Sequence, residues 1–226
     1  MRKIIVIAAL FVGLQNVFAQ QITVKDIGNF TIVKAFDKIP VELIASSESR
    51  VEILGTNNGD VNVVNKNGEL KIRMTTLKLL GGDDTKVKVY YYQKLASVQA
   101  SEGAVVTGND RIEADDLFLN AKEGAKVNVN VDARNISARV NSGGSINVSG
   151  KAKAQDVVIT SGGQYNGKGL SSENAKVAIN AGGSADITAS GQVEARTRAG
   201  GNIDIYGSPE NVSQKTLAGG KITVHK

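Results

Sequence analysis

A glycine signal that returns about every twenty residues is the feature that most constrains how this chain can fold. The signal is a Gly-Gly pair, and it occurs five times after residue 100 in a chain of 226 residues. The pairs are Gly143-Gly144, Gly162-Gly163, Gly182-Gly183, Gly200-Gly201 and Gly219-Gly220, and two degenerate copies with one glycine, Glu102-Gly103-Ala104 and Glu123-Gly124-Ala125, precede them. Counted at the second glycine of each pair, or at the single glycine, the intervals are 21, 20, 19, 20, 18 and 19 residues. Such a period is typical of solenoids.

Apolar and polar residues alternate on both sides of each glycine pair. Two positions after the second glycine stand Ile146, Tyr165, Ala185, Ile203 and Ile222. Polar residues lie between these positions and the next apolar ones, and this period of two indicates strands with one buried face. The residues before each pair alternate in the same way, so each repeat carries two strands with a Gly-Gly bend between them. A second turn is expected near Gly150, Gly169, Gly191 or Gly207, and the small residue before each pair, such as Ser142, is expected in a crowded inner corner.

A unit of this size cannot cover its own hydrophobic face, but stacked units can, because each strand pairs with its copy in the next turn. The sequence therefore predicts an all-β fold, a single-stranded parallel β-helix with turns of about 19–20 residues. Parallel crossovers are usually right-handed, so we expect a right-handed coil. Leucine-rich repeats are excluded because the leucine column and asparagine ladder are absent. Calcium-binding nonapeptide repeats are disfavoured because Gly200-Gly201-Asn202-Ile203-Asp204 lacks their third glycine.

The first nineteen residues have the pattern of a secretory signal peptide. Basic Arg2 and Lys3 precede a short apolar run, and Val17 and Ala19 fit a cleavage site before Gln20. The apolar run, from Ile4 to Leu14, is too short to span a bilayer comfortably. Residues 1–19 are thus predicted to be an export signal. Without Arg2 and Lys3 the formal net charge falls from +5 to +3, and the remaining basic residues are scattered, so nucleic acid is not an expected partner.

The mature chain, residues 20–226, is predicted to form one β-helix domain. Residues 20–100 are rich in strand patterns but irregular in spacing, and residues 101–226 carry the regular Gly-Gly repeats. No helical pattern, Pro-rich linker or transmembrane segment is expected in either part. Leu77 to Thr85, around Gly81-Gly82, is expected to protrude as a loop.

Composition excludes several kinds of active site. The chain contains no Cys, which rules out thiolate metal sites, iron–sulfur clusters, disulfides and cysteine nucleophiles. It contains one His, His225, which argues against a Ser–His–Asp triad and against multi-histidine metal sites. No cofactor or metal is therefore expected, and His225 is expected to be a solvated terminal residue.

Several segments together resemble the family called putative autotransporter adhesin, head GIN domain. Phe30–Val41 resembles its opening strand pair, Asn67–Ile72 resembles its Gly-x-Leu-x-Ile strand, and Lys88–Val98 resembles the segment that leads into its repeats. Gly144–Asn147 and Gly201–Asp204 resemble its repeat strands. The resemblance implies a β-helix exported by a Gram-negative bacterium, often of the Bacteroidetes type. It supplies no catalytic or binding residues that can be carried over.

The repeat register predicts one polar surface that a ligand could use. Asn147, Asn166, Asp186 and Asp204 occupy the same column on successive turns, and Tyr206 is expected to point outward beside them. Stacked carboxylates about 4.8 Å apart can raise the pKa of one of them or share a cation. Aromatic side chains also gather at Tyr90-Tyr91-Tyr92, where at least one ring is expected to face outward.

These features favour an exported protein that acts by binding rather than by catalysis. Its expected location is the periplasm, the outer membrane or the cell exterior, and its expected partner is a glycan or an envelope or surface protein. The ends of the solenoid are candidate oligomerisation surfaces. The alternative is a carbohydrate-active enzyme, a polysaccharide lyase or glycosidase, that uses Asp186 and Asp204 on the repeat face.

Overall fold

The computed structural model of the chain describes residues 22–55 and 58–225, and the predicted signal peptide lies outside them. The described part consists of strands and three single-turn 3₁₀ helices. The helices are η1 (Asn58–Asp60), η2 (Thr76–Lys78) and η3 (Gly82–Asp84). The strands are β1 (Ile22–Asp26), β2 (Ile32–Ala35), β3 (Pro40–Ala45), β4 (Arg50–Gly55), β5 (Val61–Lys66), β6 (Glu69–Met74), β7 (Thr85–Tyr91), β8 (Ser97–Ala100), β9 (Val105–Ala121), β10 (Lys126–Val140), β11 (Ser145–Ile159), β12 (Gln164–Ile179), β13 (Ser184–Ala189), β14 (Gln192–Arg198), β15 (Asn202–Tyr206), β16 (Asn211–Leu217) and β17 (Lys221–Val224).

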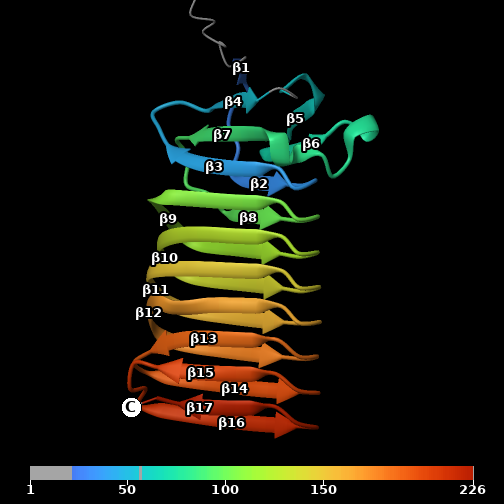
Figure 1. The fold of residues 1–226 in the computed structure, drawn as a ribbon. Coiled ribbons are helices and arrows are strands. Elements are labelled where there is room, and N and C mark those ends of the chain that lie inside the picture. The colour runs from blue at the N-terminus through green and yellow to red at the C-terminus, as the bar shows by residue number, and fades with distance from the viewer. Residues whose placement is uncertain (1–21, 56–57, 226) are drawn as a thin grey trace, which may run out of the picture.

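From β8 onward the strands stack into a parallel solenoid, and the turns follow one another down the rod in chain order (Figure 1). Equivalent residues on successive turns lie side by side. One such row is Val105, Lys126, Ser145, Gln164, Ser184, Asn202 and Lys221, with spacings of 21, 19, 19, 20, 18 and 19 residues. The predicted all-β solenoid with turns of about 19–20 residues is confirmed.

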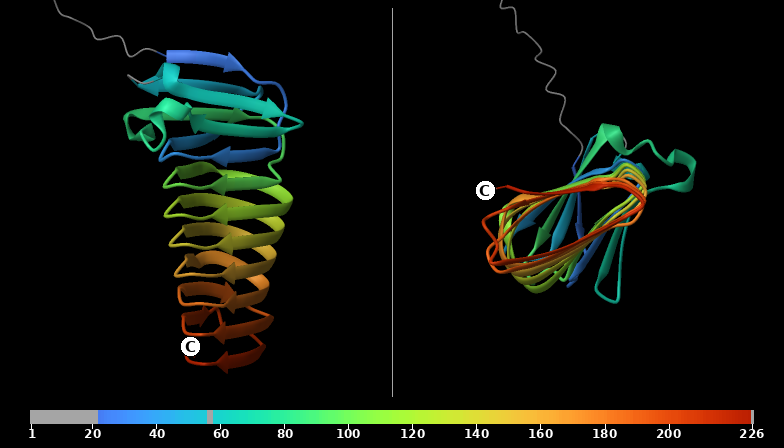
Figure 2. Two further views of the ribbon diagram at one scale, coloured as in Figure 1. Left: turned by 90° about the vertical axis from the view of Figure 1, so that its right-hand side faces the viewer. Right: turned by 90° about the horizontal axis from the view of Figure 1, so that it is seen from below.

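Each turn has two long walls, and seen along the axis the turns superpose in an elongated oval (Figure 2). The first wall consists of the segments that follow each Gly-Gly turn, and the second wall of the segments that precede the next one. In β9 to β12 a single strand of 15–17 residues runs around the corner between the walls. In the last two turns this corner is broken, so β13 and β15 lie on the first wall, and β14 and β16 on the second.

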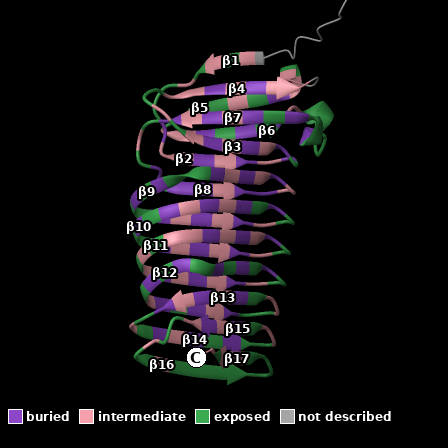
Figure 3. Cartoon of the chain, turned by 60° about the vertical axis from the view of Figure 1, so that its left-hand side comes forward, coloured by how far each residue is buried: buried purple, intermediate pink, exposed green. Residues whose placement is uncertain are grey.

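The hydrophobic core fills the space between the walls as one continuous cluster. Alternating side chains point inward, as the period of two predicts; Val127, Ile146 and Ile203, for example, are fully buried on the first wall. The strands of the middle turns alternate between buried and exposed residues, whereas β16 is exposed along most of its length (Figure 3). No helix in the described ranges is long and apolar enough to cross a membrane.

The structure corrects the expected role of the residue before each glycine pair. Ser142 is exposed instead of buried, because it and Gly143 both adopt left-handed φ angles, 47° and 70°, that form the tight turn. The crowded inner position belongs to the second glycine: a Cβ on Gly144 would collide with the carbonyl oxygen of Ala121.

The alignment of the two degenerate copies also differs from the sequence-based alignment. The N–H of Gly124 donates to the carbonyl of Ser142, as that of Gly143 does to Ser161 one turn later. Gly124 and its counterpart Gly103 therefore correspond to the first glycine of each later pair, and buried Ala125 occupies the place of the second.

The N-terminal part forms an irregular cap whose strands do not stack in chain order. β2 lies between β6 and β8, and β3 lies between β7 and β9 (Figure 1). The turn formed by β2 and β3 is therefore inserted between two pairs of strands that come later in the chain. β4 pairs antiparallel with both β1 and β7, which ends the parallel stack. The expected loop is present with different bounds: residues 75–84, with η2 and η3, project from the side of the cap (Figure 2). Thr85, which was expected to end the loop, is instead the buried first residue of β7.

Candidate functional site

The predicted polar column exists on the outer side of the first wall. Asn147, Asn166, Asp186 and Asp204 are direct neighbours on four consecutive turns. Asn128 precedes them, and its side-chain oxygen accepts a hydrogen bond of 2.7 Å from the Asn147 amide. The asparagines border a shallow hollow of about 450 Å³. The sequence therefore placed these side chains correctly with respect to one another.

Tyr206 points outward as expected, but its ring is already covered. The ring of His225 stacks on it with centroids 4.4 Å apart, and the Lys168 ammonium lies 4.1 Å from its centroid. One ring face cannot accommodate both groups at these distances, so we infer that both faces of Tyr206 are occupied. This ring offers no free face on which a sugar could stack.

His225 is not the isolated solvated residue that its position in the sequence indicated. Its Nε2 lies 2.6 Å from Oδ1 of Asp204, and its backbone N–H donates to the carbonyl of Ile205. The sequence reasoning missed this contact because it treated the chain terminus as free. In the fold, the residue after β17 lies beside the end of β15, so His225 reaches both Asp204 and Tyr206.

The pKa of Asp186 in the predicted column is shifted from its ordinary value. Burial raises the pKa of its carboxyl above the ordinary value, and the negative charge of Asp204 adds to this effect. Lys168 and His225 partly oppose the shift. The expected coupling between the two stacked aspartates is therefore present. Within the described ranges, no three acidic or histidine side chains are arranged to hold a metal ion.

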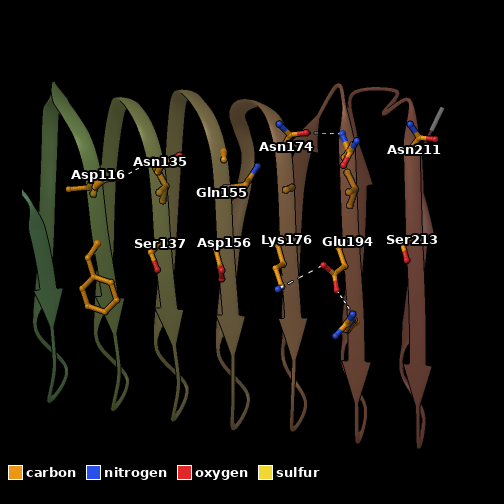
Figure 4. A pocket seen from close by; sticks show the side chains of 18 of the residues that line it. Asp116, Asn135, Ser137, Gln155, Asp156, Asn174, Lys176, Glu194, Asn211 and Ser213 are labelled. Atoms are coloured by element: carbon orange, nitrogen blue, oxygen red, sulfur yellow. Dashed lines mark hydrogen bonds and ion pairs between the residues drawn. The ribbon is translucent and has the colours of Figure 1, made fainter.

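A larger groove lies on the second wall, where the strands leave the corner. It has a volume of about 980 Å³ and runs across six consecutive turns, from β9 to β16 (Figure 4). A column of hydrogen-bonding side chains follows it, and its members are Asp116, Asn135, Asn174, Gln192 and Asn211, with Ala154 in the third place. Asn135 donates a hydrogen bond of 2.8 Å to Asp116, and the Asn174 oxygen accepts one of 3.1 Å from the Gln192 backbone.

A second column lies beside the first and carries the charges of the groove. Its members are Phe118, Ser137, Asp156, Lys176, Glu194 and Ser213. Most of these charges have partners: Glu194 pairs with Arg196 and with Lys176, and Asp156 lies 3.1 Å from Arg139. The groove therefore presents amides and hydroxyls together with charges that largely neutralise one another.

Beneath the groove the core contains a polar network that holds the wall in place. Gln155 is buried, and its amide nitrogen donates to Ser172 Oγ at 2.8 Å and to the Thr188 carbonyl at 3.2 Å. Its oxygen accepts a hydrogen bond of 3.0 Å from the hydroxyl of Tyr165, which is also fully buried. Burial raises the pKa of this phenol well above its ordinary value. Gln155 directly follows Ala154, so these hydrogen bonds hold the strand in place at the turn where Ala154 interrupts the amide column.

The sequence reasoning did not identify this groove, although the sequence contains a signal for it. An amide or carboxyl side chain stands nine residues before the second glycine of the turn, or before the alanine that replaces it, in five of six turns. Asn135 and Gly144 illustrate the spacing, as do Asn174 and Gly183. These residues belong to the corner, where the alternation of buried and exposed positions is less regular, and only the three-dimensional register shows that they form a column.

The chain matches a known protein family over most of its length. Residues 29–209 match the family described as "Putative auto-transporter adhesin, head GIN domain". No curated protein matches the chain.

Solved structures share the fold at low sequence identity. A putative adhesin from Bacteroides fragilis superposes with a TM-score of 0.84 at 16% identity, covering 92% of this chain and 98% of its own. A putative adhesin from Parabacteroides distasonis gives a TM-score of 0.69 at 22% identity, covering 91% and 97%. A putative lipid binding protein from the same organism gives 0.66 at 13% identity, covering 92% and 97%. At these identities the likeness concerns the fold.

Proposed function

Because the chain belongs to the head GIN domain family of putative auto-transporter adhesins, we propose that it is an exported protein of the cell envelope that binds without catalysis. Its ligand is an extended, uncharged glycan that lies along the groove of the second wall. The observation that carries this proposal is the column of Asp116, Asn135, Asn174, Gln192 and Asn211, which repeats a hydrogen-bonding group on five of six turns.

The spacing of the column supports an extended ligand. Neighbouring strands of a sheet lie about 4.8 Å apart, so a chain running along the rod meets an amide or carboxyl group on five of the six turns and Ala154 on the other. Amide groups donate to and accept from hydroxyls, and carboxylates accept from them. Hydroxyls are the groups that a polysaccharide repeats along its length. A rigid solenoid holds these side chains in place before binding, which reduces the entropy that binding costs.

The charges of the groove support an uncharged ligand. Glu194 and Asp156 are paired with basic residues, so a strongly anionic or cationic chain would have to break existing ion pairs. Accordingly, we expect the affinity to change little with ionic strength.

The polar column favours a glycan over a lipid tail, although the accessible lining of the groove is more apolar than polar. The apolar residues of the floor, such as Leu117, Ile136 and Val193, are buried in the core. A hydrocarbon chain along the groove would nevertheless cover the side chains of the polar column without satisfying their hydrogen bonds, at a cost in desolvation.

An array of immobilised neutral and charged polysaccharides tests the proposal. We expect the mature chain to bind a neutral glycan, and the triple variant Asn135→Ala/Asn174→Ala/Asn211→Ala to lose that binding while keeping its fold. The matched control carries Asn128→Ala/Asn147→Ala/Asn166→Ala on the first wall and should bind like the wild type. If the control variant lost binding and the groove variant kept it, the site would lie on the first wall. Binding to lipid vesicles in place of every glycan would reject the proposed ligand.

The alternative function, a carbohydrate-active enzyme, is favoured by a different observation on the first wall. A raised pKa next to a second carboxylate, as at Asp186 beside Asp204, is one feature of the general acid in glycosidases. An assay for new reducing ends or unsaturated products, with Asp186→Asn as the inactive control, tests this function. Product formed by the wild type and not by this variant would replace the binding function with catalysis.

A further inference from the structure

We propose a second binding site, in the hollow of the N-terminal cap, that takes a single uncharged pyranose ring stacked on Tyr92. This hollow has a volume of about 430 Å³ and lies between the end of β1, the residues before β4 and the residue after β7. It is separate from the groove in sequence and in position, because none of its lining residues belongs to the solenoid turns from β8 onward. The inference does not depend on the proposed function of the groove.

Tyr92 provides an aromatic ring that is open to solvent. Its side chain is 56% exposed, and it is the one aromatic residue among the exposed large hydrophobic residues of the described ranges. Tyr91, the preceding residue, is buried at the end of β7 and points the opposite way. By contrast, the ring of Tyr206 is covered by His225 and Lys168. An aromatic ring that borders a hollow and stays open to solvent is suited to stack on the apolar face of a sugar.

The wall beside Tyr92 is held rigid by a network around Arg50. The Arg50 guanidinium lies 3.7 Å from the centroid of the Tyr90 ring and contacts Glu48 at 2.8 Å and Glu52 at 3.3 Å. The hydroxyl of Tyr90 donates to Glu52 at 3.0 Å. These contacts fix the side chains before a ligand arrives and neutralise the charge of Arg50, so the site gives little attraction to an anionic sugar.

Polar groups around the ring supply hydrogen bonds for hydroxyls. The hydroxyl of Ser49 is buried and lacks a hydrogen-bond partner among the described residues, although Ser49 lines the hollow. Asn29 and Glu48 line it as well and add an amide and a carboxylate. Because the Ser49 hydroxyl has almost no accessible surface, its side chain must rotate toward the hollow before a ligand hydroxyl can pair with it. That pair would recover the cost of burying an unpartnered hydroxyl. The volume lies at the small end of the range for ligand sites, which fits one sugar ring.

Nuclear magnetic resonance titration of the mature chain tests the second site. The probes are glucose, galactose, mannose and N-acetylglucosamine, each added alone, and the readout is the chemical shift of the Tyr92 ring and of the Ser49 amide. We expect at least one of these sugars to move both signals. Tyr92→Phe keeps the ring and should bind that sugar as the wild type does, whereas Tyr92→Ala should weaken binding about tenfold.

The controls separate this site from the groove. The groove variant Asn135→Ala/Asn174→Ala/Asn211→Ala should show the same shifts of Tyr92 as the wild type. Tyr92 is on the surface, so Tyr92→Ala should keep the fold, as the remaining signals of the spectrum will show. The proposal is overturned if none of the four sugars moves the Tyr92 ring, or if Tyr92→Ala binds as tightly as the wild type.

Discussion

At the scale of single residues, the solenoid depends on positions where only glycine fits. Gly150 has a φ angle of 110°, and a Cβ at this position would collide with the carbonyl oxygen of Val131 on the neighbouring turn. Both constraints apply at once, since the backbone conformation disfavours a side chain and the space for one is absent.

We therefore expect Gly150→Ala to lower the free energy of unfolding by at least about 2 kcal/mol. The matched control is Gly59→Ala, because a Cβ on Gly59 meets no atom within 4 Å. Urea denaturation followed by circular dichroism measures both variants. If the two variants were equally stable, the neighbouring turns at Gly150 would be able to move apart enough to accommodate a methyl group.

The buried network around Gln155 gives a second prediction. Tyr165→Phe removes the hydroxyl that donates to Gln155 and leaves a buried amide oxygen without a donor. We expect a loss of about 1–3 kcal/mol in the free energy of unfolding. Tyr206→Phe is the control, because its hydroxyl is not part of a buried network. If Tyr165→Phe were neutral, the Gln155 oxygen would have found another donor, which an added water in a crystal structure of the variant would reveal.

The pKa of Asp186 predicts how stability depends on pH. A folded-state pKa above the unfolded value means that folding disfavours the ionised carboxylate, so its contribution is favourable at low pH and is lost as the pH rises through the folded pKa. Asp186→Asn should therefore stabilise the protein at neutral pH and have less effect in acid. The gain should stay below about 1 kcal/mol because the side chain is partly exposed. A gain that grew as the pH fell would contradict the direction of the shift.

At the scale of the elements, the regular turns could be predicted and the cap could not. The apolar positions around Ile146 and Ile203 alternate clearly, and the glycine pairs fix the turns, so the walls and the column from Asn147 to Asp204 follow from the sequence. The insertion of β2 between β6 and β8 depends on contacts between residues far apart in the chain, which no local pattern encodes. The groove was missed for the same reason, since Asn135, Ala154 and Asn174 are brought into one column only by the register of the strands.

Two leucines of the cap test this distinction between a buried strand and an exposed loop. Leu70 on β6 is 0% exposed, whereas Leu77 in η2 is 95% exposed. Leu70→Ala should lower the free energy of unfolding by about 2–5 kcal/mol, because it leaves a cavity in the core. Leu77→Ala should change it by no more than about 0.5 kcal/mol. Thermal denaturation of both variants checks this, and a large loss in Leu77→Ala would show that the loop packs against another part of the molecule.

At the scale of the whole molecule, the rod presents different surfaces on its walls and at its cap. The first wall carries a ladder of asparagines and aspartates that ends at the Asp204–His225 contact. The second wall carries the groove, and the cap carries the hollow beside Tyr92. A solenoid keeps these surfaces in fixed positions, because each turn is held by backbone hydrogen bonds to its neighbours.

The central claim is that the groove binds an extended neutral glycan, with one contact on each of the five turns that carry a polar side chain in the column. Calorimetric titration with oligosaccharides of increasing length, prepared from the glycan that the array identifies, tests it most directly. The account predicts that affinity rises with each added sugar until the groove is filled, and that Asn135→Ala/Asn174→Ala/Asn211→Ala removes this rise. An affinity that is the same for the monosaccharide and the longest oligosaccharide, or that the triple variant leaves unchanged, would contradict it.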